Sequence, residues 1–195
     1  MLAFAASAKG AALDERLLHA GDLIFHQSRS AQSQAIQAAT HSRYSHMGML
    51  WRQDGQWMVY EAVDPVQLTP LRDWVRRGAG GHFVVKRLRD ESVLTRDVLT
   101  RMREVGERYR GKPYDLYFGW SDDRIYCSEL VWKIYEAGAG VEIGRLQRLR
   151  AFDLSAPLVR KKLRERYGAH VPLDEPVISP SAMFDSDKLV EVISR

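Results

Sequence analysis

The sequence predicts an α+β fold, in a single domain over residues 1–195. Short apolar stretches with strand character alternate with stretches of helical periodicity, without internal repeats or low-complexity tracts. Asp54-Gly55 lies between two strand-like stretches and is a strong two-residue hairpin signal, so at least one strand pair is antiparallel. Strands joined by a hairpin and interrupted by helices favour α+β over a doubly wound parallel sheet.

The composition is that of an ordinary globular chain. Of its 195 residues, 45% are hydrophobic and 28% are charged, which excludes a disordered, collagenous or coiled-coil protein. No apolar run approaches the roughly 20 residues that span a bilayer. Met1–Ala8 resembles the end of a signal peptide but lacks a positive n-region and a full apolar h-region. The compartment, periplasm or cytoplasm, therefore stays open.

In the first part of the chain, turn and cap residues separate the expected elements. Gly21-Asp22 precedes the first strand, and Thr69-Pro70 has the pattern of an N-cap followed by proline at the first helical position. Four glycine or alanine residues then end that helix. In chain order we expect helix, strand, helix, two hairpin strands and helix, at residues 14–19, 23–26, 30–40, 45–51, 56–63 and 69–77.

In the second part, glycines end the helices. Gly111 follows one helical pattern, and Gly138 follows the pattern that begins at Cys127. An aromatic-rich and Asp-rich loop separates these two helices. In chain order we expect strand, helix, loop, helix, helix and a short final strand, at residues 82–88, 95–109, 112–124, 127–137, 157–167 and 189–193.

Cys127 is the only cysteine of the chain, which excludes an intramolecular disulfide and a multi-cysteine zinc site. Cys127, Leu130, Val131 and Ile134 share one face of their helix. A thiol in the first turn of a helix is stabilised as thiolate, and the free N–H groups there also stabilise an oxyanion. The sequence therefore predicts either a nucleophile or a small buried apolar side chain at this position.

The hairpin around Asp54-Gly55 contains a candidate base for the cysteine, His46. A two-residue turn pairs Gln53 with Gln56, so Glu61 faces Gly48 and is a diagonal neighbour of His46. Diagonal neighbours on one sheet face lie roughly 7–8 Å apart, within reach of long side chains. This is the arrangement of a base and its orienting carboxylate. The alternatives are a core histidine and a charge on the open face of the hairpin.

The other histidines carry less signal. His26 and His41 flank the first helix and are expected near the same cleft, whereas His41 and His46 lack a third ligand for a metal. Walker A and Gly-x-Gly-x-x-Gly motifs are missing, so we expect no metal and no cofactor. Without a patterned carboxylate, three further histidines are read as surface or packing residues: His19, His82 and His170.

Positive charge concentrates in the segment Arg145–Tyr167. This segment holds eight Lys or Arg and two Asp or Glu, a charge of +6 in a chain whose total is +4. It contains no nucleic-acid-binding motif, and a solvated helix face is the simplest interpretation. The alternative is peripheral contact with an anionic membrane surface.

Four motifs, in this order, resemble the circularly permuted NlpC/P60 papain-like hydrolases, in particular their YiiX-like branch. The histidine precedes the cysteine in the chain, as in circular permutants. The resemblance covers about residues 20–140, and residues 145–195 form a C-terminal extension that shapes the cleft or binds a partner. The motifs are Gly21-Asp22-Leu23-Ile24-Phe25, Tyr44-Ser45-His46-Met47-Gly48-Met49, Tyr60-Glu61-Ala62 and Tyr126-Cys127-Ser128-Glu129-Leu130-Val131.

The resemblance implies a fold and a site. The fold is a permuted papain-like one, with an antiparallel sheet packed against helices and the cysteine at a helix N-terminus. Cys127 would be the nucleophile, His46 the base and Glu61 the orienting residue. A tyrosine near the oxyanion hole is best matched by Tyr114, which would act together with the backbone N–H of Cys127.

We therefore expect a thiol hydrolase that cleaves amide bonds, such as those of peptides or cell-wall-type amides, through a thioester intermediate. A lipid acyl-ester hydrolase or acyltransferase at a membrane surface is the first alternative. A catalytically inactive binding module is the second. If the chain is an enzyme, we expect His46 to lie within hydrogen-bonding reach of Cys127.

Overall fold

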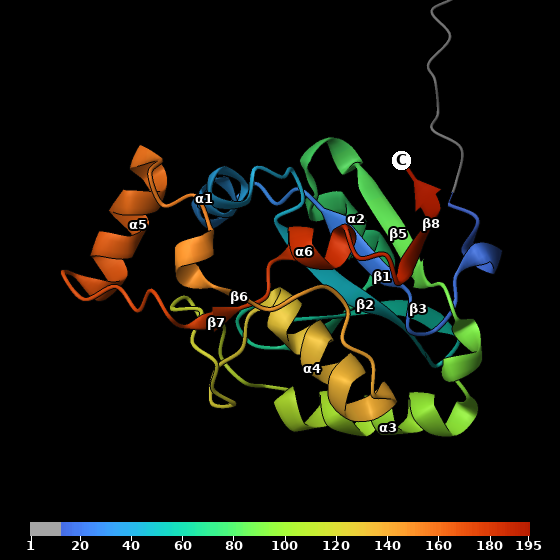
Figure 1. Cartoon of the computed structure of the whole chain (residues 1–195). Coiled ribbons are helices and arrows are strands. Elements are labelled where there is room, and N and C mark those ends of the chain that lie inside the picture. The colour runs from blue at the N-terminus through green and yellow to red at the C-terminus, as the bar shows by residue number, and fades with distance from the viewer. Residues whose placement is uncertain (1–12) are drawn as a thin grey trace, which may run out of the picture.

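The computed structural model describes residues 13–195, so the signal-like segment Met1–Ala8 lies outside the described residues. One six-stranded antiparallel sheet forms its centre, with the strand order β4-β3-β2-β1-β5-β8 (Figure 1). A second sheet pairs two short strands, β6 and β7. The bounds are β1 Leu23–His26, β2 His46–Gln53, β3 Gln56–Glu61, β4 Gln67–Pro70, β5 Phe83–Leu88, β6 Gln147–Arg148, β7 Pro176–Val177 and β8 Leu189–Ser194.

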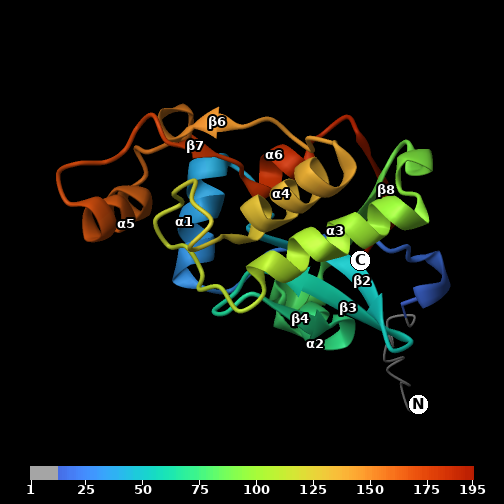
Figure 2. The same ribbon diagram turned by 90° about the horizontal axis from the view of Figure 1, so that it is seen from below.

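Helices cover both faces of the main sheet, which confirms the α+β class. The helices α3 and α4 lie side by side below the sheet in Figure 1, and α2 lies above it. Figure 2 shows α3 and α4 side by side again, with α1 and α5 beyond them. The bounds are α1 Ala31–Thr40, α2 Leu71–Arg77, α3 Arg96–Tyr109, α4 Cys127–Ala139, α5 Pro157–Tyr167 and α6 Pro180–Phe184. None of the helices within residues 13–195 is long and apolar enough to cross a membrane.

The central strands β1 and β2 are buried on both faces, and their alternate residues enter two separate cores. In β1, Leu23 and Phe25 pack in the core under α3 and α4, whereas Ile24 packs in the core under α2. The second core is centred on Trp74 of α2, which is fully buried. Because both of their faces are covered, the sequences of β1 and β2 are largely apolar runs rather than polar–apolar alternations.

The β2–β3 hairpin has the register that the Asp54-Gly55 turn predicts. Gln53 pairs with Gln56, and continuing the register places Glu61 opposite Gly48. A side chain at Gly48 would be impossible without movement, because its Cβ would lie 2.7 Å from the carbonyl oxygen of Tyr60. Glycine therefore lets β2 and β3 approach closely beside the histidine and the glutamate.

Helix α4 runs two residues further than predicted. The expected stop at Gly138 is wrong, because Gly138 lies inside the helix and Gly140 ends it in the left-handed conformation, with φ 67°. A Cβ at Gly138 would lie 2.7 Å from the Cα atom of Met102 in α3. This glycine therefore allows the close packing of α3 on α4.

The expected N-cap at Thr69 is also wrong. Thr69 and Pro70 end strand β4, where they pair with Val59 and Met58 of β3, and α2 begins at Leu71. Strand β4 is at the sheet edge, a position that tolerates proline. Its four residues are too short to give a hydrophobic period, so only the pairing with β3 reveals the strand.

The C-terminal segment, residues 145–195, packs on the rest of the fold at three places, one of them next to Cys127. Strand β8 pairs with β5, and α5 packs against α1. The Ser128 hydroxyl donates to the carbonyl oxygen of Ile178 at 2.8 Å, and the N–H of Ile178 donates to the Tyr126 hydroxyl at 3.1 Å. The sequence predicted α5 and β8 but not β6, β7 or α6, whose few residues show no periodicity.

Candidate active site

Four separate segments bring the predicted site residues together. His46 is the first residue of β2, Glu61 is the last residue of β3, and Cys127 is the first residue of α4. Tyr114 lies in the loop before α4 and forms an isolated parallel bridge with Ile125. That bridge positions Tyr114 beside the start of the cysteine helix.

His46 and Glu61 form a buried hydrogen-bonded pair. The Nε2 atom of His46 lies 2.7 Å from Oε2 of Glu61, whose side chain is fully buried. Burial opposes the charge of this carboxylate. The hydrogen bond and charge of His46, together with Thr69 and Arg77, nevertheless lower the pKa of Glu61 to about 2. The carboxylate is therefore ionised and binds the imidazole in one orientation.

His46 also interacts with the thiol of Cys127. Burial raises the pKa of Cys127, but the hydrogen bond and charge of His46 and the N–H groups of Met47 and Ser128 lower it below its usual value. For His46 the balance is reversed: burial lowers its pKa, and the bonds to Cys127 and Glu61 raise it to about 9. Because Nε2 faces Glu61, the other ring nitrogen, Nδ1, is left for the sulfur. The arrangement favours a thiolate–imidazolium pair.

The phenol of Tyr114 is a hydrogen-bond donor at the same sulfur. Burial, and then the charge of Cys127 and the hydrogen bond to it, raise the pKa of Tyr114 well above its usual value. The phenol therefore stays protonated and can donate to a negative charge beside the sulfur. The N–H of Cys127 is in the first helical turn, where backbone donors have no partner within the helix.

Two side chains that the sequence analysis missed contact Glu61. The Thr69 hydroxyl donates to Oε1 of Glu61 at 2.5 Å, and the guanidinium of Arg77 pairs with the same oxygen. Thr69 comes from β4 and Arg77 from the end of α2. Neither position has a local motif for this contact, which depends on the pairing of β4 with β3.

His26 lies in the site, but His41 does not. His26 is paired with His46 across β1 and β2, lines the same cleft, and stacks on Trp74 at 3.9 Å between ring centroids. Burial and the nearby charges of His46 and Arg77 lower the pKa of His26 to about 3, so its imidazole is neutral. His41 is exposed and pairs with an aspartate outside the cleft.

The three outlying histidines lie at surface or packing positions, as expected. His19 has a carboxylate partner, because its Nδ1 lies 2.7 Å from Oε2 of Glu91 on the surface. The two residues are 72 positions apart, so no local pattern joins them. His82 stacks near Tyr44, and His170 is exposed, as expected for packing and surface residues.

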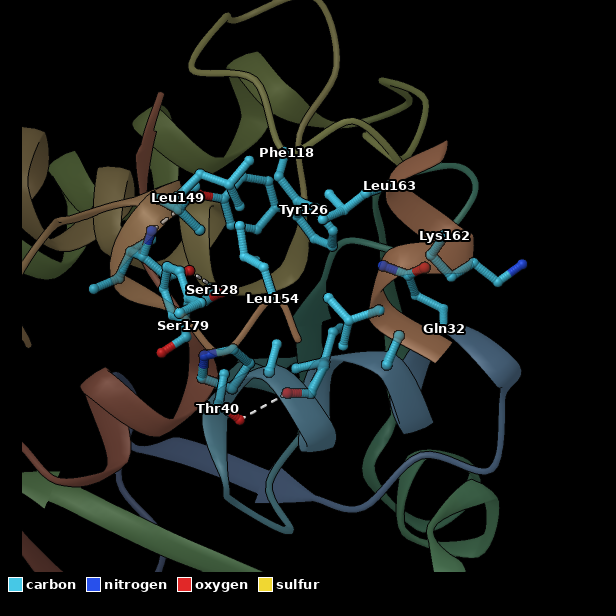
Figure 3. Close-up of a pocket in the computed structure, with 18 of the residues that line it drawn as sticks. Gln32, Thr40, Phe118, Tyr126, Ser128, Leu149, Leu154, Lys162, Leu163 and Ser179 are labelled. Carbon is cyan, nitrogen blue, oxygen red and sulfur yellow. Dashed lines mark hydrogen bonds between the residues drawn. The ribbon is translucent and has the colours of Figure 1, made fainter. Parts of the chain in front are cut away.

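Two hollows lie beside the candidate site. A cleft lined largely by polar side chains, the polar cleft, contains His46, Tyr114 and Arg77. An apolar pocket lies between α1, α4, α5 and the C-terminal segment (Figure 3), and Cys127 is one of the residues that line it. In Figure 3 the rings of Phe118 and Tyr126 line the pocket, whereas the ammonium end of Lys162 points away from it. Cys127 therefore lies in the wall of the apolar pocket, whereas its partners His46 and Tyr114 line the neighbouring polar cleft.

Comparison with known proteins identifies the family. The model of the permuted papain-like amidase enzymes of the YaeF/YiiX type matches residues 17–193. The protein YiiX of Escherichia coli strain K12 is 50% identical over 172 residues, which cover 88% of this chain and 84% of YiiX. A crystal structure of yiiX from Escherichia coli O157:H7 superposes with a TM-score of 0.86 at 50% identity, covering 91% of this chain and 97% of the other.

The crystallised relative is described as a metalloprotein. Within residues 13–195 of this chain, no group of three or more His, Cys, Asp or Glu side chains is arranged to hold a metal ion. By the family match and the 50% identical relative, the chain belongs to the permuted papain-like amidases of the YaeF/YiiX type and is a papain-like cysteine amidase.

Proposed function

We propose that this amidase acts by acyl transfer to Cys127, with His46 as general base and acid and Glu61 as the orienting carboxylate. The observation that carries the proposal is the continuous buried chain from Glu61 through His46 to the sulfur. The lowered pKa of Cys127 and the raised pKa of His46 support the proposal, because together they favour the reactive thiolate–imidazolium pair.

The steps follow from these positions. The Cys127 thiolate attacks the amide carbonyl carbon, and the carbonyl electron pair moves to oxygen. The resulting oxyanion accepts hydrogen bonds from Tyr114 and from the N–H of Cys127. The His46 imidazolium gives its proton to the leaving nitrogen as the C–N bond breaks, which leaves a thioester and a free amine.

Hydrolysis of the thioester completes the cycle. His46, now neutral, takes a proton from water, and the hydroxide attacks the thioester carbon. The C–S bond breaks, the carboxylic acid leaves, and the thiolate–imidazolium pair is restored. Throughout, Glu61 remains ionised and stabilises the imidazolium through Nε2.

The test is turnover of a panel of peptide and small amides by the full chain and its site variants. We expect Cys127→Ala to abolish turnover and Glu61→Gln to lower kcat by roughly 10²- to 10⁴-fold. Tyr117→Phe, at an exposed side chain of the same loop as Tyr114, is the matched control for Tyr114→Phe. Wild-type turnover by Cys127→Ala would refute the mechanism. A wild-type chain inert toward every substrate and toward thiol labelling would favour the inactive binding module.

A second candidate, hydrolysis or transfer of lipid acyl groups, is favoured by the apolar pocket at Cys127. Most of the side chains that line it are aliphatic or aromatic, such as Ile36, Leu154 and Leu163. Acyl esters and amides of increasing chain length separate the candidates. Rates that rise with chain length, and that fall when Leu154→Asp makes the pocket polar, support an acyl substrate. Rates independent of length support a small amide or peptide.

A further inference from the structure

The carboxylate of Glu61 has one oxygen that His46 does not use. Oε2 faces Nε2 of His46, whereas Oε1 accepts from the Thr69 hydroxyl at 2.5 Å and from the guanidinium of Arg77. We propose that Thr69 and Arg77 are positioning residues that keep Glu61 ionised and aimed at His46. The inference rests on the proposed role of Glu61 and adds two residues to its machinery.

Burial makes such support necessary. The side chain of Glu61 is fully buried, and a buried carboxylate without partners takes up a proton rather than remain charged. A protonated Glu61 would be a weak acceptor for His46 and would no longer stabilise its imidazolium. The two donors on Oε1 oppose protonation of Glu61. They also fix the rotation of the carboxylate, because turning it would break its contacts with His46, Thr69 and Arg77 together.

The two donors belong to one structural unit. Thr69 lies in β4 and faces Val59 of β3, and α2 follows β4 directly and ends at Arg77. Thr69 is buried, whereas the side chain of Arg77 is 43% exposed and lines the polar cleft. Strand β4 positions Thr69 and helix α2 positions Arg77, so the two elements together hold the carboxylate of Glu61.

Thr69 allows a test without a change of charge. The charged and titratable groups that face this network come from four elements and one loop: His46 on β2, His26 on β1, Arg77 on α2, Cys127 on α4 and Tyr114 in the loop before α4. All of them remain in Thr69→Val, which replaces the hydroxyl with a methyl group of similar size. Thr69→Ser keeps the hydroxyl and is the matched rescue variant.

The measurement is the rate of Cys127 alkylation by iodoacetamide against pH, which needs no substrate. Loss of the Thr69 hydroxyl weakens Glu61 as a partner of His46, so the imidazolium and the thiolate it stabilises both become less favourable. We expect Thr69→Val to shift the acidic side of the rate–pH profile upward by about one pH unit. At a given pH on that side, alkylation of Cys127 should then be about tenfold slower. Thr69→Ser should retain the wild-type profile. Thermal unfolding confirms that each variant is folded.

Substitution of Arg77 is a second, independent test. Its side chain is partly exposed, so this test remains available if Thr69→Val does not fold. We expect Arg77→Met to slow alkylation at pH 6 by roughly tenfold, with partial recovery in Arg77→Lys. Arg76→Met is the control, since Arg76 is an exposed neighbour on the same helix that pairs with Asp73. Its alkylation profile should match the wild type.

The outcomes separate the two proposals. Wild-type profiles for both Thr69→Val and Arg77→Met, with a shifted profile for His46→Ala, would overturn the positioning role and leave the mechanism intact. A wild-type profile for His46→Ala would overturn the proposed mechanism itself. The inference is supported if the alkylation profile shifts in Thr69→Val and Arg77→Met. The rescue variants Thr69→Ser and Arg77→Lys should reverse those shifts.

Discussion

At the residue scale, opposing effects act on the thiol of Cys127. Burial disfavours the thiolate, while His46 and two backbone N–H groups favour it, and the net effect lowers the pKa. Glu61 shows the same competition, with its pKa lowered to about 2 despite full burial. In both cases hydrogen bonds to the charged form outweigh desolvation, which is the pattern expected of a preorganised site.

We predict that Cys127 alkylates rapidly below the pH at which free thiols react. In the wild type the thiolate persists below the free-thiol pKa of about 8.5, because His46 is protonated beside it. In His46→Ala the rate should fall at neutral pH and rise only toward that value. Iodoacetamide kinetics from pH 5 to 10 measure both profiles, and superimposable profiles would show that His46 does not activate the thiol.

The lowered pKa of Glu61 also predicts that the stability of the fold depends on pH. Its pKa is about 2 when folded and 4.5 in its ordinary state, so its stabilising contribution is complete above about pH 4.5. It is lost as the pH falls toward 2, because the unfolded state binds the proton first. Urea unfolding should show a steeper loss of stability between pH 4.5 and 2.5 in the wild type than in Glu61→Gln. Equal slopes would contradict the assignment.

At the scale of elements, two close approaches shape the site. Gly48 lets β3 lie against β2, and Gly138 lets α3 lie against α4, the helix that begins with the cysteine. Neither glycine has a positive φ, so close backbone approach rather than a turn explains both. The active-site geometry thus depends on backbone spacing as well as on side chains.

We predict that Gly138→Ala destabilises the fold by about 1–3 kcal/mol, because the new methyl group would overlap the backbone of Met102. Chemical unfolding measures the loss. Ala137→Ser, on the exposed side of the same helix, is the control and should change stability by less than about 0.5 kcal/mol. An unchanged stability in Gly138→Ala would show that the helices can separate at little cost.

At the scale of the whole molecule, basic and apolar groups gather at the end that carries α5. Figures 1 and 2 both place α5 beyond α1, away from the main sheet. Arg160, Lys161 and Arg164 are exposed on this helix. Tyr117 is half exposed and its ring lies 5.7 Å from that of Tyr167 at the end of α5. We propose that this end meets anionic membrane surfaces peripherally.

Vesicle co-sedimentation tests the membrane proposal. Each Lys or Arg near an anionic surface contributes about 1 kcal/mol, so three reversals of charge should abolish binding. We expect the wild type to bind anionic but not neutral vesicles at low salt and to dissociate at high salt. The variant Arg160→Glu/Lys161→Glu/Arg164→Glu should remain in the supernatant. Negligible binding of the wild type to both vesicles would leave α5 as ordinary solvated surface.

The sequence by itself determined the local features of this protein. The Asp54-Gly55 turn set the hairpin register, and with it the neighbourhood of His46 and Glu61. The apolar spacing after Cys127 placed the thiol at the start of a helix. The family resemblance, carried by four motifs, is confirmed by the match over residues 17–193. These features depend on residues a few positions apart, which turn chemistry and helical periodicity describe well.

Only the tertiary structure decided which distant groups support the site. Thr69 has the sequence signature of an N-cap, yet it is a strand residue whose hydroxyl serves Glu61. Arg77 reaches the site from the end of α2, and Ile178, in the loop after β7, donates to Tyr126, the residue before Cys127. No local pattern connects either residue to the site. Gly138 resembles a helix stop because glycine commonly is one, whereas here it makes room for α3. Such contacts depend on how elements pack, and packing is a property of the whole chain that no window of neighbouring residues contains.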